Sequence, residues 1–163
     1  MNTTDPASVS ALNTVDDNRK LALTQLLAVE DPSLIDVDPH CATHLTVGVG
    51  KHQEEYLVLT DAEAAAEVRV RIEDSLWAFD PSFIAEHSVL AIIPRGAALA
   101  LIATCQQKCE DANPVLKALV VDMDKFVAHA VSADGRGHFL SPYDGKEHVV
   151  DVGWDTFYIY RVN

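Results

Sequence analysis

The sequence has no long apolar run. Its longest apolar stretch, around residues 97–103, is far shorter than the roughly 18 residues of a membrane-spanning helix. The N-terminus also lacks the basic flank and apolar run of a secretory signal peptide. We therefore expect no membrane partner, and we expect the protein to act in a cytoplasm.

Positive charge is scarce. Lys and Arg number 12 against 25 Asp and Glu, which gives a formal net charge of −13. Direct binding to nucleic-acid phosphates needs a basic stripe, so we expect no direct nucleic-acid partner. An acidic excess can instead attract a basic protein.

Cysteine is rare, with three residues in the chain. An odd number without an export signal favours reduced thiols. A zinc site is one interpretation of the cysteines and their histidine neighbours, but the spacing matches no standard zinc module. Small buried side chains explain them as well, so we expect no metal and no other cofactor. Whether these residues meet in space stays open: His40, Cys41, His44, Cys105 and Cys109.

Motifs of common enzyme sites are absent too. The chain has no phosphate-binding glycine loop followed by Lys-Ser or Lys-Thr, no dinucleotide fingerprint and no serine elbow. We assign no catalytic residue, and the sequence favours a protein that is not an enzyme.

Hydrophobic periodicity predicts the elements of the N-terminal half. Residues 1–13, rich in Ser, Thr, Asn and Ala, are expected to form a flexible tail, and residues 14–163 a single domain. A first helix begins at Thr14, and residues 31–42 form a loop. Residues 43–49 and 54–59 are two strands joined by a turn at residues 50–53. Thr60 and Glu63 form a capping box that opens a helix reaching Phe79.

The C-terminal half is predicted to be helical first and then a hairpin. Helices cover residues 96–110, a short segment from Asn113, and a segment that follows Asp122 and ends at Gly135, whereas residues 88–94 fit a strand or a helix. Strands at residues 148–152 and 156–162 flank a turn. The fold class is α+β, with an antiparallel sheet built from the early and the C-terminal hairpin and about four to five helices on one face.

Three stretches carry a family resemblance. They are residues 56–61 (YLVLTD), residues 74–79 (DSLWAF), and residues 133–140 (ADGRGHFL) continuing through 143–145 (YDG) to 157–161 (FYIYR). Together they resemble a group of short tailed-bacteriophage proteins without assigned function, over roughly residues 43–163. The resemblance implies a phage origin and a place in the host cytoplasm, and it brings no ligand or site residue with it.

The glycine-rich segment 134–145 is the first candidate binding site. Its glycines let backbone approach a ligand closely, and Arg136 and His138 are able to hold an anion. Tyr143 and Asp144 complete the set. The alternative is a structured turn in which Arg136 pairs with an acidic neighbour.

A second candidate site is a partner surface. Trp154 sits in the predicted C-terminal turn, where an aromatic side chain is difficult to bury and is able to anchor a partner. Acidic side chains on exposed faces provide a candidate acidic surface, although solvated helix faces explain them equally. They are Glu54, Glu55, Glu63, Glu67 and Asp74.

Three functions remain in view. The first is a phage-encoded acidic interaction protein that binds and modulates a host protein or complex, itself basic or nucleic-acid-binding. A counter-defence inhibitor of the anti-CRISPR or anti-restriction type is one such protein. The second is a small-molecule or nucleotide binder, or an enzyme, that uses residues 134–144. The third is a minor virion or assembly component, and a homodimer stays open.

Overall fold

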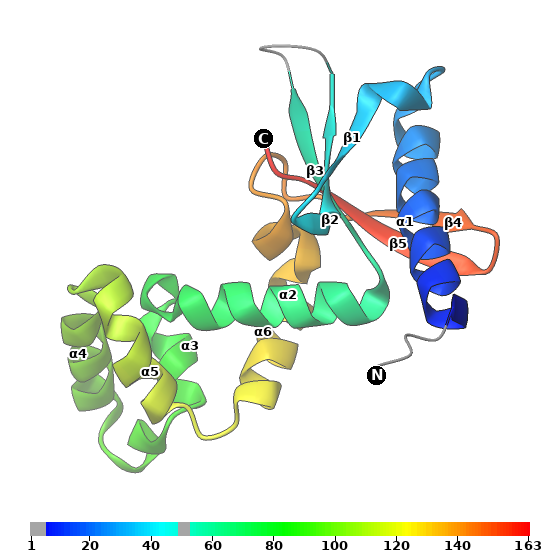
Figure 1. Ribbon diagram of the computed structural model, residues 1–163. Coiled ribbons are helices and arrows are strands. Elements are labelled where there is room, and N and C mark those ends of the chain that lie inside the picture. The colour runs from blue at the N-terminus through cyan, green and yellow to red at the C-terminus, as the bar shows by residue number, and fades with distance from the viewer. Residues whose placement is uncertain (1–5, 49–52) are drawn as a thin grey trace. The chain divides into compact units, whose positions relative to one another are not determined.

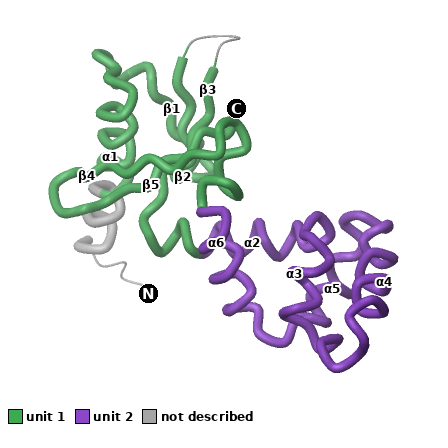
Figure 2. The backbone as a smooth tube through the Cα atoms, turned by 180° about the vertical axis from the view of Figure 1, so that it is seen from behind, with its two compact units in different colours: residues 1–65, 136–163 green, residues 66–135 purple. Residues whose placement is uncertain are grey.

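The structure is a computed structural model that describes residues 6–48 and 53–163 (Figure 1). The chain forms two compact units (Figure 2). The sheet unit comprises the described part of residues 1–65 together with residues 136–163, and the helical unit comprises residues 66–135. Two segments therefore connect the units, one within each of two helices.

The sheet unit contains one antiparallel sheet (Figure 1). Pairing of β3 with β5, for example Leu57 with Tyr160, joins the early hairpin to the C-terminal one. The predicted α+β class and the single antiparallel sheet made from both hairpins are therefore confirmed. The strands, in the spatial order β1-β2-β3-β5-β4, are β1 (Ile35–Asp38), β2 (Cys41–Val47), β3 (Glu54–Leu59), β4 (His148–Val152) and β5 (Asp155–Arg161).

Strand β1 was not expected, because residues 31–42 were predicted to be a loop. The segment instead holds a short 3-10 helix, η1 (Pro32–Leu34), followed by β1. Ile35 is the only buried residue of β1, since the strand lies at the edge of the sheet. A strand that buries one side chain among polar neighbours and prolines has little alternation for the sequence to reveal.

Helix α1 (Pro6–Leu27) begins earlier than Thr14. Proline is tolerated in the first turn of a helix, so Pro6 starts the element rather than interrupting a tail. The expected tail at residues 1–13 is therefore helical from Pro6 onward, and residues 1–5 lie outside the described residues. The predicted turn at residues 50–53 also lies outside them, apart from Gln53.

Both faces of the sheet are covered. Ala22 and Leu23 of α1 enter a core with alternate residues of the sheet, namely Ile35, Leu45, Tyr56, Val58, Val152, Phe157 and Ile159. The opposite face includes Leu57 and Tyr160, and residues 136–147 contact it. The sequence suggested that the helices pack on one face of the sheet. In the structure two separate segments, α1 and residues 136–147, each cover a face.

The helical unit has its own buried core. Helix α2 begins within the sheet unit and α6 ends there. The elements are α2 (Asp61–Asp74), η2 (Leu76–Ala78), α3 (Pro81–Glu86), η3 (Val89–Ile92), α4 (Arg95–Gln106), η4 (Cys109–Ala112), α5 (Asn113–Leu119) and α6 (Met123–Leu140). Its core side chains are Ile72, Leu76, Ile84, Ile102, Leu116 and Phe126. Within residues 6–48 and 53–163, no helix has the length and apolar character needed to cross a membrane.

The capping residues of α2 and α6 were predicted correctly, and the tertiary contact that ends α2 was not. Thr60 and Glu63 form the expected capping box, and Asp122 accepts a hydrogen bond from the N–H of Lys125 at the start of α6. Helix α2, however, stops at Asp74 and not at Phe79. The Asn113 amide donates to the Asp74 carbonyl and accepts from the N–H of Trp77, 3.0 Å away, so Asn113 ends α2.

Two glycines shape α6. Gly135 has φ 78 and ψ 158, a conformation that interrupts the helix as predicted. The chain then resumes helical structure to Leu140, so the predicted loop is helical over residues 136–140. An added Cβ on Gly137 would lie 2.4 Å from the Gly145 carbonyl oxygen, which shows that this glycine allows a close backbone approach.

We expect Gly137→Ala to destabilise the protein by about 1–3 kcal/mol, because backbone must move to admit the methyl group. The matched control is Gly96→Ala in α4, where an added Cβ meets no atom of the described residues within 4 Å. Alanine there should raise the free energy of unfolding by up to about 1 kcal/mol. Denaturant unfolding measures both, and equal effects of the two substitutions would contradict the close approach.

Candidate functional site

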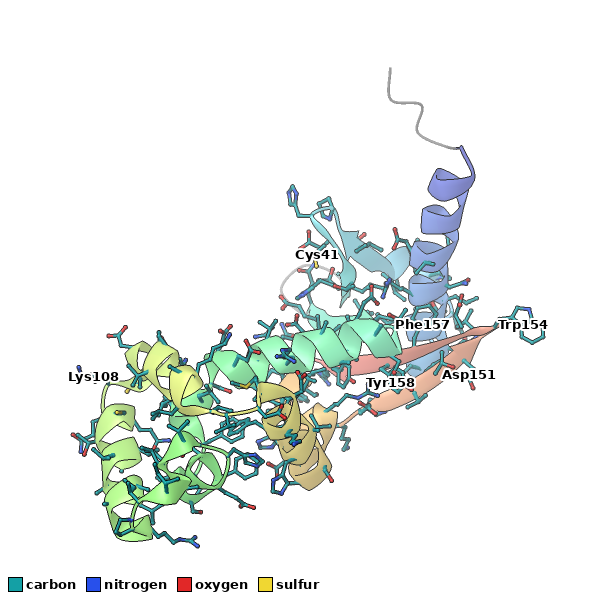
Figure 3. All side chains as sticks on the ribbon, turned by 90° about the horizontal axis from the view of Figure 1, so that it is seen from below. Cys41, Lys108, Asp151, Trp154, Phe157 and Tyr158 are labelled. Carbon is teal, nitrogen blue, oxygen red and sulfur yellow. The ribbon has the colours of Figure 1, made fainter. Side chains whose placement is uncertain are left out.

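The turn between β4 and β5 presents one aromatic side chain to solvent. Strand β4 ends at Val152 and β5 begins at Asp155, which leaves a two-residue connection. Gly153 has φ 63, the left-handed conformation that such hairpin loops favour and that glycine adopts at little cost. Trp154 follows it at the end of the hairpin, 104% exposed, and points away from the sheet (Figure 3).

Two side-chain hydrogen bonds brace this turn. The Thr156 hydroxyl donates to the Asp151 carboxylate across the hairpin, 2.7 Å away. The Asn18 amide of α1 donates to the Asp155 carboxylate at 2.9 Å. The turn is therefore fixed to its own strands and to α1, and a group presented on a fixed support loses less conformational entropy on binding.

The same turn is acidic. Asp151 and Asp155 flank Trp154, and within the described residues neither carboxylate forms an ion pair with Lys or Arg. We call Asp151, Gly153, Trp154 and Asp155 the Trp154 tip. An indole beside two uncompensated carboxylates suits a basic surface, because a cation both pairs with the carboxylates and stacks on the indole face.

Arg19 holds α1, and with it Asn18, in place. Its side chain is buried, and its guanidinium donates to the Val58 carbonyl of β3 and to both oxygens of Glu63, at 2.7 and 2.9 Å. Its Nε is buried without a hydrogen-bond partner in the part of the chain that the structure describes, and the Asp16 carboxylate lies 3.7 Å from it. Arg19 thus links α1, β3 and the capping box at the start of α2.

The ionisation of Glu63 depends on this contact. Burial opposes the charged form, but hydrogen bonds from Arg19 and Thr60 outweigh burial and hold the pKa of Glu63 below its usual value. Glu63 was predicted to belong to an acidic surface. It instead balances a buried cation and caps a helix.

Arg136, predicted to bind an anion, is used within the sheet unit. Its guanidinium pairs with Glu147 and Asp61, each 2.8 Å away, and lies 4.2 Å from the centre of the Tyr158 ring. Burial alone would lower the pKa of Arg136, but the two carboxylates outweigh it and raise the pKa further. The Tyr160 hydroxyl also donates to Glu147, and burial together with this carboxylate raises the pKa of Tyr160.

The other residues of segment 134–145 have separate environments. His138 is exposed and its ring contacts Phe139. Tyr143 is 57% exposed and lies over the guanidinium of Arg161, 3.8 Å from it. The Asp144 carboxylate accepts from the Ser141 hydroxyl and the N–H of Lys146, and these bonds lower its pKa. The four predicted binding residues of this segment therefore make their contacts within the sheet unit.

The predicted acidic surface is largely neutralised by neighbours. Glu54 pairs with Arg161 and accepts from the Tyr56 hydroxyl, whose pKa is raised to about 12 by burial and by this carboxylate. Glu67 pairs with Arg71 in the helical unit. Exposed Glu55 and Asp74 belong to the sheet unit and the helical unit respectively.

The predicted cysteine and histidine residues are also divided between the units. His40, Cys41 and His44 belong to the sheet unit, and Cys41 contacts the Thr43 hydroxyl at 3.2 Å. Cys105 and Cys109 do not share a helical face, because α4 ends at Gln106 and Cys109 has φ 51. In residues 6–48 and 53–163, no three His, Cys, Asp or Glu side chains gather in a way that could hold a metal ion.

The sequence predicted the exposure of Trp154 but not the residues that support its turn. The alternating strands around Gly153 predict the turn, and the turn predicts an exposed side chain. Asn18 lies 137 residues away from Asp155, so no local pattern connects them. A comparison of the chain with protein-family models, with curated proteins and with solved structures found no match.

We expect the indole of Trp154 to behave as a fully solvated group. In a Trp77→Phe variant, acrylamide should quench the remaining fluorescence about as efficiently as it quenches N-acetyltryptophanamide, because Trp154 is 104% exposed. The reciprocal variant, Trp154→Phe, retains half-buried Trp77 and should be quenched less. A blue-shifted, shielded emission from Trp154 would contradict the geometry of the tip.

Glu63 should make the free energy of unfolding depend on pH in the acidic range. Because its folded pKa is lowered, its contribution is present above the unfolded value of about 4.5 and is lost as pH falls through the folded value. Glu63→Gln should therefore be less stable than the wild type at pH 7, and the difference should shrink towards pH 3. Urea unfolding of both proteins across this pH range measures the difference in the free energy of unfolding. A difference that stays constant with pH would exclude the Arg19–Glu63 pair as its source.

Proposed function

We propose that this chain is a bacteriophage interaction protein that binds and modulates a basic host protein in the host cytoplasm. The Trp154 tip is the docking point. The observation that carries the proposal is an indole 104% exposed to solvent on a braced turn, between two carboxylates that have no cationic partner within residues 6–48 and 53–163.

The hairpin itself does not require tryptophan at this position. Gly153 supplies the backbone conformation, and a polar residue after it would serve the turn equally while keeping less apolar surface in water. Tryptophan is enriched among the residues that dominate binding energy, because a large rigid side chain fills a partner's pocket at low entropic cost. An exposed indole fits an anchor better than a structural side chain.

Charge argues for the kind of partner. The chain carries −13 overall, and the carboxylates of the tip add a local negative potential. Such a surface steers a basic protein towards it and raises the association rate at low salt. Proteins that bind nucleic acid have such basic faces, so a host defence complex, and with it an anti-CRISPR or anti-restriction role, fits this chemistry.

The small-molecule alternative has less support. It places the ligand on Arg136 and its neighbours, but Arg136 is engaged by two carboxylates and stacked near Tyr158. A ligand anion would have to displace both carboxylates. The phage origin, for its part, rests on the resemblance of residues 43–163.

The experiment is affinity capture of a host partner with three forms of the tagged protein. The wild type and Tyr143→Ala, which removes a different exposed aromatic ring, should retain the same basic host protein. Trp154→Ala should lose it, since truncating an anchor of this kind costs about 2 kcal/mol or more, roughly 30-fold in affinity. Retention of the partner by Trp154→Ala would contradict the proposal.

Salt and a charge-neutral variant test whether electrostatic attraction contributes to partner binding. Affinity for the captured protein should fall as salt is raised, because exposed charges are screened. Asp155→Asn keeps a hydrogen-bond acceptor for Asn18 and removes the charge, so it should weaken binding and flatten the salt dependence. Salt-independent binding would exclude a basic partner surface.

A further inference from the structure

Two histidines of the helical unit face each other. His87 follows the end of α3, and His129 lies on α6. The Nε2 atom of His87 is 2.8 Å from the Nδ1 atom of His129. Neither residue was singled out by the sequence, because they are 42 positions apart.

The fold holds both rings in position. The backbone carbonyl of His87 accepts a hydrogen bond from Val121, 2.9 Å away, which ties the end of α3 to the segment just before α6. The His87 and His129 rings lie 5.1 and 4.9 Å from the centre of the Phe83 ring, and His87 also contacts Phe126. Aromatic packing therefore fixes both imidazoles, although His129 is exposed and His87 is half-buried.

This arrangement brings together two imidazole nitrogen atoms that are each able to bind a metal ion. In the hydrogen bond, one nitrogen carries the proton and the other offers its lone pair. Two imidazole nitrogens bound to one tetrahedral zinc ion, each about 2.0–2.1 Å from the metal, lie roughly 3.3 Å apart. The observed 2.8 Å separation needs to open only slightly for an ion to replace the shared proton.

We propose that His87 and His129 together bind one divalent transition-metal ion of the Zn²⁺ or Cu²⁺ type. Imidazole nitrogen is a preferred ligand of these ions. The proton that lies between the rings moves to the other nitrogen of its own ring, so each neutral imidazole offers one lone pair. No third His, Cys, Asp or Glu joins the pair among the described residues, and water completes the coordination.

The surroundings favour a cation. A cleft of about 280 Å³ beside His87 is also lined by Glu86, Asp122 and Lys125, which leaves a net negative charge. The net charge of the whole chain acts in the same direction. This site lies in the helical unit and is independent of the Trp154 tip, which belongs to the sheet unit.

Isothermal titration of the untagged, metal-free protein with ZnCl₂ tests the site. The wild type should bind one ion per chain, and His129→Phe should weaken binding by more than about tenfold, since removing a ligand costs at least as much as removing its outer support. Phenylalanine retains the packing on Phe83, and a thermal melt without metal shows whether the variant is folded. His87→Asn provides a second loss of ligand should His129→Phe not fold.

Controls locate the ion. His138→Ala and His44→Ala remove histidines of the sheet unit and should leave binding unchanged. The Cu²⁺ complex of the wild type should show nitrogen splitting from two imidazoles in electron paramagnetic resonance, and that pattern should be lost in His129→Phe. Absence of Zn²⁺ binding by the wild type, undiminished binding by folded His129→Phe, or loss of binding in His44→Ala would each overturn the assignment.

Discussion

The buried guanidinium of Arg19 is the contact on which the sheet unit depends. It joins α1 to the Val58 carbonyl of β3 and to Glu63 of the capping box, and it lies within reach of the Phe157 ring. Loss of the carboxylate would leave a buried cation without its partner, which is strongly destabilising, so the cation and the carboxylate depend on each other. Asn18 is next to Arg19 in the chain, and it fastens the turn that carries Trp154.

Acidic residues serve two different purposes in this protein. Glu63, Glu147 and Glu54 neutralise Arg19, Arg136 and Arg161, and so link elements of the sheet unit to one another. Asp151 and Asp155 have no such cations among the described residues and are exposed beside an indole. The net charge of the sequence does not distinguish these two groups, because it counts paired and unpaired carboxylates alike.

The sequence predicted the features that depend on neighbours in the chain. The Thr60–Glu63 capping box, the helix start after Asp122, the break at Gly135 and the turn that contains Trp154 each rest on residues a few positions apart. Features that depend on distant residues were missed. Asn113 ends α2 from 39 positions away, and Arg19 meets Glu63 across 44. Strand β1 was not predicted, because an edge strand that buries only Ile35 shows almost no alternation of apolar and polar residues.

The proposed partner surface is tested most directly by a photo-crosslinking amino acid placed at position 154. Irradiation of host cells that produce this variant should attach the chain to one basic host protein. The same amino acid in place of Tyr143, which is also exposed on the sheet unit, should not capture that protein. No specific crosslink from position 154, or the same crosslinked protein from both positions, would contradict docking through the Trp154 tip.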